Sequence, residues 1–331
     1  MKTIVQDDMG QNDGVPSASQ APMRQGDTLL ASIKQHPLLY VMVIPGLVFF
    51  LMFRIIPSLG CIIAWQKYNI FKGILGSPWV GWQNFQQMLA YPDFGRIMYN
   101  TLAIGGLLII VGFPVPILLA LLINEVRSNG LKRLIQTLIY MPHFLSWVIV
   151  GQLVYSLLSP TSGIVNVIIT AFGGKSIFFM AQGSLFKPIA VLAHIWKEAG
   201  FLSIVYIAAI SGIDQTRYEA AEIDGAGRWT KMGRITLPLI MPTIVVMLLL
   251  EIGRFLEVGF DHIWNLLNSV VWSQGDILNT YIFRVGLQDG RYSLTTAIGI
   301  FKAVIGFVLL VGGNKLSEKL TGRGFFIKTI P

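Results

Sequence analysis

The sequence carries little charge and only one cysteine. Charged residues make up 13% of its 331 residues, whereas soluble globular domains carry about 25%. The single cysteine, Cys61, excludes an internal disulfide and a thiolate metal cluster. No basic patch with interleaved aromatic residues occurs, so we expect no nucleic-acid partner. No nucleophile–base pair, metal cluster or pair of catalytic carboxylates stands out either, which disfavours an enzyme.

The first 35 residues lack the features of a secretory signal peptide. They have no basic start, no apolar stretch and no small-residue cleavage site. They are polar instead, with Gly, Ser, Gln and Asp, a composition typical of a flexible segment. We therefore expect residues 1–35 to form a cytoplasmic lead-in to the first apolar segment.

Apolar residues, by contrast, are abundant and lie in long runs. They make up 53% of the sequence, and the mean hydropathy is +0.63. A transmembrane helix needs about 20 mainly apolar residues, and six segments meet that requirement. These segments are Leu38–Trp65, Asn100–Ile123, Leu134–Leu158, Pro188–Ile213, Leu237–Phe260 and Leu294–Gly312. The sequence thus predicts an all-α, polytopic membrane protein, in which prolines kink several spans.

Lysine and arginine are distributed unevenly between the apolar segments. The net charge is +8. With the N-terminus inside, the cytoplasmic segments hold roughly twice as many of these residues as the external ones, so both termini are predicted to be cytoplasmic. The basic residues of the cytoplasmic face also suit contact with anionic membrane lipid. The expected domains are a transmembrane region over 36–313, which includes a cytoplasmic loop at 214–236, and a tail over 314–331.

The predicted cytoplasmic loop has the pattern of a short helix, a turn and a second helix. Thr216 and Glu219 are spaced as a capping box, and Asp214 is a second possible N-cap. Gly225 can adopt the left-handed conformation that ends the first helix, and residues 227–235 favour a second short, basic helix. The small residues 220 and 221 lie between carboxylates, so another protein could approach closely. An ordinary amphipathic helix at the membrane surface is the alternative interpretation.

A short motif elsewhere imitates part of a nucleotide-binding loop. Residues 173–176 match the end of a phosphate-binding loop, but Ile169 stands where that loop requires glycine. The motif is also predicted to lie on the external side, away from cytosolic ATP. We therefore expect this chain itself to bind no cofactor.

The cytoplasmic loop resembles a known family signature. Its pattern is Glu-Ala-Ala, three residues, Gly, nine residues, then Ile-x-Leu-Pro, which is similar in spacing to the signature loop of binding-protein-dependent ABC importer permeases. The matching residues are Glu219, Ala220, Ala221, Gly225, Ile235, Leu237 and Pro238. The resemblance implies that the loop, with Asp224 and Arg228 beside its turn, is a coupling helix that docks in a cleft of an ATPase subunit.

Three further stretches, residues 112–125, 140–148 and 292–302, are similar to carbohydrate-uptake permeases, and closest to the branch that handles oligo- and polysaccharides. An alginate-type importer is one member that the chain resembles. The resemblance implies the type I ABC importer permease fold and saccharide import across the bacterial inner membrane. It also implies a second, related permease, two ATPase subunits that bind ATP and Mg, and a periplasmic or lipid-anchored solute-binding protein.

Several charged residues fall within the predicted spans. Such groups are costly in the bilayer and usually face a bundle interior or a water-filled path. In the fifth span the charged residues are three or four positions apart, which predicts one polar stripe on a helix. The charged candidates for the saccharide pathway are Lys197, Glu198, Glu251, Arg254 and Asp261, and Glu257 belongs to the same stripe. The alternatives are structural pairing of Arg254 and Lys197 with neighbouring carboxylates, and snorkelling of side chains at the span ends.

Aromatic rings are also candidates, since ring faces suit the C–H faces of pyranoses. The candidates for stacking are Trp147, Trp196, Trp264 and Tyr281, and of these Trp196 and Trp264 are assigned to the pathway. Interfacial anchoring or packing is nevertheless the commoner role of tryptophan in spans. His143 is expected to be a hydrogen-bonded structural group. His194 and Glu198 lie four residues apart, but no third ligand lies nearby, so no metal site is expected.

A secondary transporter driven by an ion gradient is the alternative function. Such proteins often show inverted repeats with broken helices around a midplane site. The sequence shows no internal repeat, and this alternative leaves the signature loop unexplained.

Overall fold

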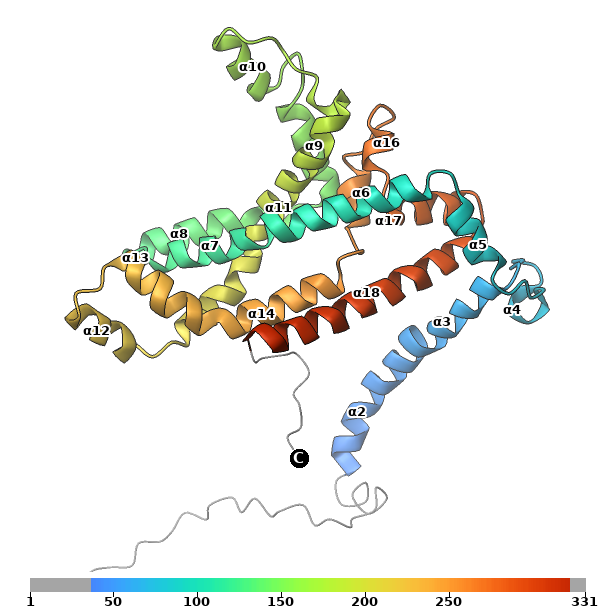
Figure 1. Ribbon diagram of the computed structural model, residues 1–331, viewed down its shortest axis with the longest axis horizontal. Coiled ribbons are helices and arrows are strands. Elements are labelled where there is room, and N and C mark those ends of the chain that lie inside the picture. The colour runs from blue at the N-terminus through green and yellow to red at the C-terminus, as the bar shows by residue number, and fades with distance from the viewer. Residues whose placement is uncertain (1–36, 322–331) are drawn as a thin grey trace, which may run out of the picture. The chain divides into compact units, whose positions relative to one another are not determined.

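The computed structural model describes residues 37–321, and every regular element in that part of the chain is a helix (Figure 1). A single isolated antiparallel bridge joins Gln66 and Trp79. The chain forms two compact units, residues 1–60 and 61–331. The predicted N-terminal lead-in lies outside the described residues, as does the end of the predicted tail.

The first unit contains one long apolar helix. It comprises α2 (Pro37–Phe50), a π-helical turn and α3 (Ile56–Leu59), and a 3-10 helix (Gly60–Trp65) extends the span beyond the last residue of this unit. Its length and composition suffice to cross a membrane, as the sequence predicted. Large apolar side chains are exposed along the whole of α2, so none of the described residues of this unit covers them.

The helical bundle of the second unit contains two pairs of long helices. α6 (Phe94–Leu107) and α7 (Pro114–Asn124), joined by a π-helical turn, form the second span, and α7 packs beside α11 (Gly183–Ser211). α14 (Leu237–Gly253) lies beside α18 (Tyr292–Thr321). The described part thus holds five helices that could cross a membrane, or six if one bent pair is a single span.

That bent pair is the third predicted span, which is broken rather than continuous. α8 (Asn129–Tyr140) and α9 (Trp147–Leu157) meet at an angle of 103° (Figure 1). Pro142, which lacks a backbone N–H, lies at the start of the connecting turn. Ser146 then starts α9 afresh, because its hydroxyl accepts the Ile149 N–H at 3.3 Å.

The fifth span also differs from its prediction at both ends. The basic helix expected over 227–235 is not separate: α13 (Arg228–Lys231) continues through a π-helical turn into α14. The helix ends at Gly253, whereas the sequence predicted it to reach residue 260, and a new helix, α15 (Phe260–Trp264), begins after a non-helical stretch. The predicted polar stripe of residues 251–261 therefore does not exist as one helical face.

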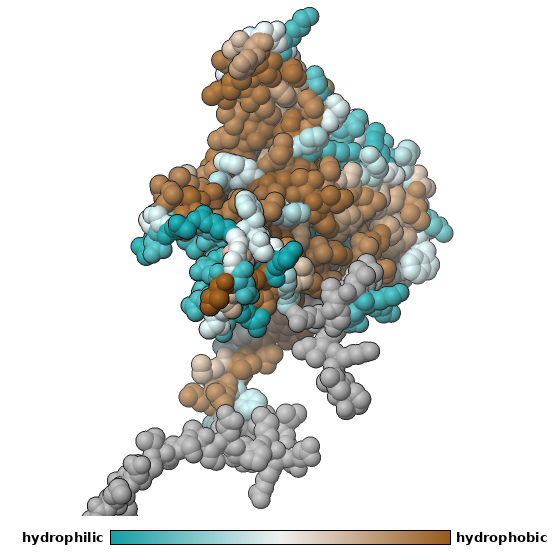
Figure 2. All heavy atoms as spheres, turned by 60° about the vertical axis from the view of Figure 1, so that its left-hand side comes forward, coloured by the Kyte–Doolittle hydropathy of each residue, from teal (hydrophilic) through white to brown (hydrophobic). Residues whose placement is uncertain are grey.

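Short helices occupy the predicted loops. Those on the predicted external side are α4 (Gly73–Gly76), α5 (Gln83–Ala90), α10 (Ile164–Ala171), α16 (Trp272–Gly275) and α17 (Leu278–Ile282). α12 (Thr216–Ile223) lies beside α13, at the end of the second unit opposite α5 and α16 (Figure 1). Figure 2 brings this end forward and shows hydrophilic side chains over it, in front of a largely apolar surface.

Gly200 provides a test of the packing at the broken span. A Cβ added there would lie 1.9 Å from the Ile139 carbonyl oxygen, so only glycine lets α11 approach α8 this closely. We expect Gly200→Ala to cost at least about 1–3 kcal/mol of stability through overpacking. Gly106→Ala is the matched control, since its Cβ would meet nothing within 4 Å. Thermal unfolding of both variants in detergent measures the difference; equal melting temperatures would contradict the packing described.

Candidate functional site

The first candidate site is the α12 loop, residues 214–236. The Asp214 carboxylate accepts the Thr216 N–H at 3.0 Å, and this bond to the backbone lowers the pKa of Asp214 below its ordinary value. α12 begins at Thr216 itself, with Gln215 in the N-cap position and no side-chain cap. The predicted capping box of Thr216 and Glu219 is therefore wrong. Asp214, the other predicted N-cap, lies one position before the N-cap residue, although its carboxylate does accept the first N–H of α12.

The turn at Gly225 follows the prediction. Gly225 has φ +74°, a conformation that favours glycine. The Ala226 N–H donates to the Ala221 carbonyl at 2.8 Å, and the Gly225 N–H donates to the Glu222 carbonyl at 3.0 Å. These two bonds form a Schellman motif, which satisfies the last carbonyls of α12 and fixes the direction in which the chain leaves it.

The α12 loop presents a free surface. Glu219, Ala220, Asp224 and Arg228 are exposed, and Ala221 is half-buried. Within the described part of the chain, the Glu219 carboxylate has no hydrogen bond or ion pair. Its charge is therefore available to a partner.

Sequence reasoning missed two apolar side chains in the same loop. Ile223 is 87% exposed and Trp229 is 75% exposed. A lone large apolar residue on either side of the Gly225 turn, within an otherwise polar stretch, was the available signal. Exposed aromatic and aliphatic side chains of this kind are common at the centres of protein interfaces.

Two contacts hold α12 against the start of the fifth span. The Tyr218 and Thr236 hydroxyls lie 2.9 Å apart, and Lys231 Nζ donates to Glu222 Oε1 at 2.5 Å. That donation lowers the pKa of Glu222, so its carboxylate remains ionised at neutral pH. The loop is thus folded onto the base of α14.

The second candidate site is the break in the fifth span, residues 254–259. The exposed Arg254 follows the last helical residue, and no ion pair to it exists among the described residues. The break lies at membrane depth, because a Cβ on Gly306, inside the span Tyr292–Lys315, would meet the Gly253 carbonyl oxygen at 3.1 Å. Glu257, within the break, and Asp261, just after it, are also exposed. Non-helical backbone at this depth is tolerated only where it is buried in protein or lines a water-filled cavity, which makes the break a candidate for the transport path.

Lys197 and Glu198 belong instead to a paired cluster at the break in the third span. Lys197 Nζ donates to the His143 carbonyl oxygen and to Glu198 Oε1, both at 2.8 Å. The second Glu198 oxygen lies 2.7 Å from His143 Nδ1, and the His143 ring stacks on Phe201. The Lys197 side chain is only 7% exposed and that of Glu198 19%. This geometry favours structural pairing for Lys197.

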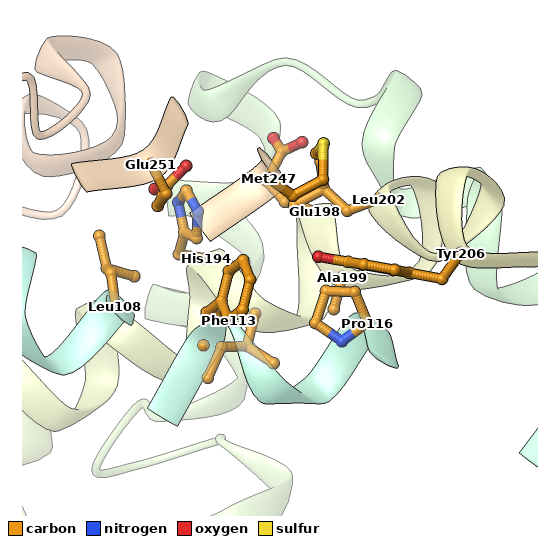
Figure 3. Close-up of a pocket in the computed structure, with 12 residues that line it drawn as sticks. Leu108, Phe113, Pro116, His194, Glu198, Ala199, Leu202, Tyr206, Met247 and Glu251 are labelled. Carbon is orange, nitrogen blue, oxygen red and sulfur yellow. The ribbon is translucent and has the colours of Figure 1, made fainter. Parts of the chain in front are cut away.

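Glu251 lies in a small cavity between α7, α11 and α14. The cavity is also lined by His194, Glu198, Tyr206 and Met247, whose side chains converge in Figure 3. Its volume of about 50 Å³ is enough for a few water molecules and too small for a sugar ring. In this conformation it does not form a continuous path.

The two tryptophan candidates lie in different surroundings. Trp196 lines an apolar groove formed by α9 and α11, with Leu157 and Leu192. Trp264 belongs to a partly exposed cluster of four aromatic rings. The distance from its ring centroid is 5.0 Å to that of Phe283, 5.3 Å to that of Phe260 and 6.3 Å to that of Trp272. The other three rings were not identified from the sequence, because they come together only through the fold.

Comparisons with known proteins agree with this architecture. Residues 112–320 match the family "binding-protein-dependent transport system inner membrane component". The chain is 45% identical over 298 residues to the Bacillus subtilis polygalacturonan/rhamnogalacturonan transport system permease protein YteP, covering 90% of this chain and 93% of YteP. It is 28% identical to the arabinooligosaccharides transport system permease protein AraP of the same organism, covering 94% of this chain and 96% of AraP.

A solved structure also matches. It is a bacterial alginate ABC transporter in complex with its alginate pentasaccharide-bound periplasmic protein; the matching chain is 43% identical, with a TM-score of 0.83 over 90% of this chain and 100% of that one. The helices and the exposed loop thus define a transport permease. The chain belongs to the family of binding-protein-dependent transport system inner membrane components, and the resemblance to carbohydrate ABC importer permeases is confirmed.

Lys197→Met tests the paired cluster. It leaves Glu198 and the His143 carbonyl without their ammonium partner, and we expect a loss of about 3 kcal/mol in stability. The double variant Lys197→Met/Glu198→Gln should recover part of that loss, and exposed Lys175→Met is the control. Melting temperature and yield measure the effect. A stable Lys197→Met protein that has lost only uptake would show that Lys197 lines the pathway instead.

Proposed function

We propose that the chain is the permease subunit of an ATP-driven importer that moves oligo- or polysaccharide across the bacterial inner membrane. It receives the saccharide from an external solute-binding protein and works with a second, related permease. The observation that carries this proposal is the α12 loop, in which Glu219 and Ala220 are exposed and the Gly225 Schellman turn ends the helix.

The loop suits docking onto an ATPase subunit. Ala220 and Ala221 allow close approach, Glu219 offers an unpaired carboxylate, and Ile223 and Trp229 offer apolar anchors. ATP and Mg bind to the two ATPase subunits, and this chain contributes no cofactor site. Both termini and the α12 loop face the cytoplasm, as the Lys and Arg distribution indicates.

An acidic saccharide is the proposed cargo. Two of the similar proteins are named for polygalacturonan/rhamnogalacturonan and alginate, which are acidic polysaccharides. The exposed, unpaired Arg254 guanidinium at membrane depth fits the carboxylate of a uronic acid, because its planar fork matches carboxylate geometry. Glu251 and Asp261 border the same stretch, and the Trp264 ring cluster offers faces on which a pyranose could stack.

In the proposed mechanism, closure of the ATPase pair moves the α12 loop as a rigid lever. The spans attached to it then swing, so that the saccharide path faces outward and inward in turn. The breaks in the third and fifth spans are the places where the helices can bend, since no continuous helical hydrogen bonding crosses them.

Gly225→Val tests the lever. Positive φ is costly for a β-branched residue, so the turn should distort, and ATPase stimulation should fall about tenfold or more. Gly227→Val is the matched control, because Gly227 has φ −70° and open space around its Cα. Copurification of the ATPase subunit and sugar-stimulated ATP hydrolysis are measured. Unchanged docking and stimulation in Gly225→Val would refute the lever.

Arg254→Gln tests the pathway. Losing a charged hydrogen bond to a carboxylate costs about 1.5–3 kcal/mol, so transport of uronic-acid oligosaccharides should fall at least about tenfold. Neutral oligosaccharides should be affected less, and Arg254→Lys should retain part of the activity. Uptake is measured in proteoliposomes that contain equal amounts of intact complex. Equal losses for acidic and neutral sugars, or loss of the complex itself, would contradict the assignment.

A further inference from the structure

The α12 loop is attached very differently to the two spans that flank it. On one side, α13, a π-helical turn and α14 form one continuous helix from Arg228 to Gly253. On the other side, α11 ends at Ser211, and a short non-helical link leads to α12. Within the described part of the chain, no side-chain hydrogen bond or ion pair joins α12 to α11.

The first contact between α12 and the fifth span is a pair of hydroxyls, of which only that of Thr236 belongs to a buried residue. The Tyr218 and Thr236 hydroxyl oxygens lie 2.9 Å apart. Thr236 is 2% exposed and lies in the π-helical turn that leads into α14, and Tyr218 is half-buried. The other contact of the Thr236 hydroxyl is a long bond of 3.4 Å to the Lys231 carbonyl. Tyr218 is therefore its main partner.

The second contact between these elements is of a weaker kind. Glu222 is largely exposed, so its ion pair with Lys231 is open to solvent and to screening by salt. A hydrogen bond out of water is stronger electrostatically, and leaving one of its partners unsatisfied is costly. The hydroxyl pair is thus the contact best able to hold α12 in a fixed orientation on α14.

We propose that Tyr218 and Thr236 are positioning residues that make α12 and α14 move as one body. A displacement of α12 is then transmitted along α14 to the end of that helix at Gly253. Arg254 and the break at membrane depth follow directly after this residue. The non-helical link after Ser211 lets α11 move less. This inference rests on the proposed function, because it assumes that α12 receives force from an ATPase.

The test uses the complete importer, with ATPase subunits, partner permease and solute-binding protein, reconstituted in proteoliposomes. Tyr218→Phe and Thr236→Val each remove one hydroxyl and keep the shape of the side chain. Thr236→Ser keeps the hydroxyl. Tyr99→Phe, at an exposed tyrosine, is the matched control. ATPase copurification, melting temperature, ATP hydrolysis and saccharide uptake are measured for each variant.

We expect Tyr218→Phe and Thr236→Val to bind the ATPase normally and to transport about two- to tenfold less saccharide per ATP, as loss of one hydrogen bond predicts. The double variant should lose no more than either single variant, since both remove the same bond. Thr236→Ser and Tyr99→Phe should couple normally.

An unchanged ratio of saccharide to ATP in Tyr218→Phe would overturn this inference and leave the proposed function standing. Loss of ATPase binding in Tyr218→Phe would also overturn it, because the pair would then shape the docking surface rather than transmit motion. If the unmodified chain transports without any ATPase subunit, the proposed function falls and this inference falls with it.

Discussion

The structure depends on the need to satisfy every backbone hydrogen-bonding group in an apolar environment. In a bilayer an unpaired N–H or C=O costs several kcal/mol, so spans are helical wherever they can be. At the two breaks in this chain, side chains take over that role. Lys197 donates to the His143 carbonyl in the third span, and Asn279 Nδ2 donates to the Val258 carbonyl, 2.6 Å away, beyond the fifth. The breaks are therefore parts of the fold rather than defects in it.

The two breaks serve different purposes. At the third span, charge is neutralised within the protein, because Lys197, Glu198 and His143 face one another. At the fifth span, Arg254 remains exposed at a depth where an isolated cation is costly. Within the complex this cost is offset if a second permease and an acidic saccharide lie opposite. The α12 loop lies at the other end of the same helix, so the proposed docking surface and the proposed cargo site belong to one element.

Much of the fold could be predicted from composition, because apolar length alone determines which segments can span a membrane. The Gly225 turn could also be predicted, since one residue with a positive φ requirement ends α12 locally. The end of α14 could not, because the charged residues after Gly253 continue a helical spacing in the sequence, whereas the structure breaks the helix there. Two further features depend on how distant segments pack, which the periodicity of the sequence does not encode. One is that Lys197 is paired whereas Arg254 is exposed, and the other is the contact between Tyr218 and Thr236. The exposed Ile223 and Trp229 were visible in the sequence but were not distinguished from lipid-facing residues.

The proposed function requires that the α12 loop touches a separate ATPase in the cytoplasm. Site-directed cross-linking measures this directly. The substitution Cys61→Ser first removes the single cysteine of the chain, and Ala220→Cys then introduces a new one in the α12 loop. The assembled complex is treated with a thiol cross-linker. The account predicts a cross-linked product with the ATPase subunit whose yield changes when ATP is added. Labelling of Ala220→Cys by a membrane-impermeant reagent from the external side, with no such product, would contradict it.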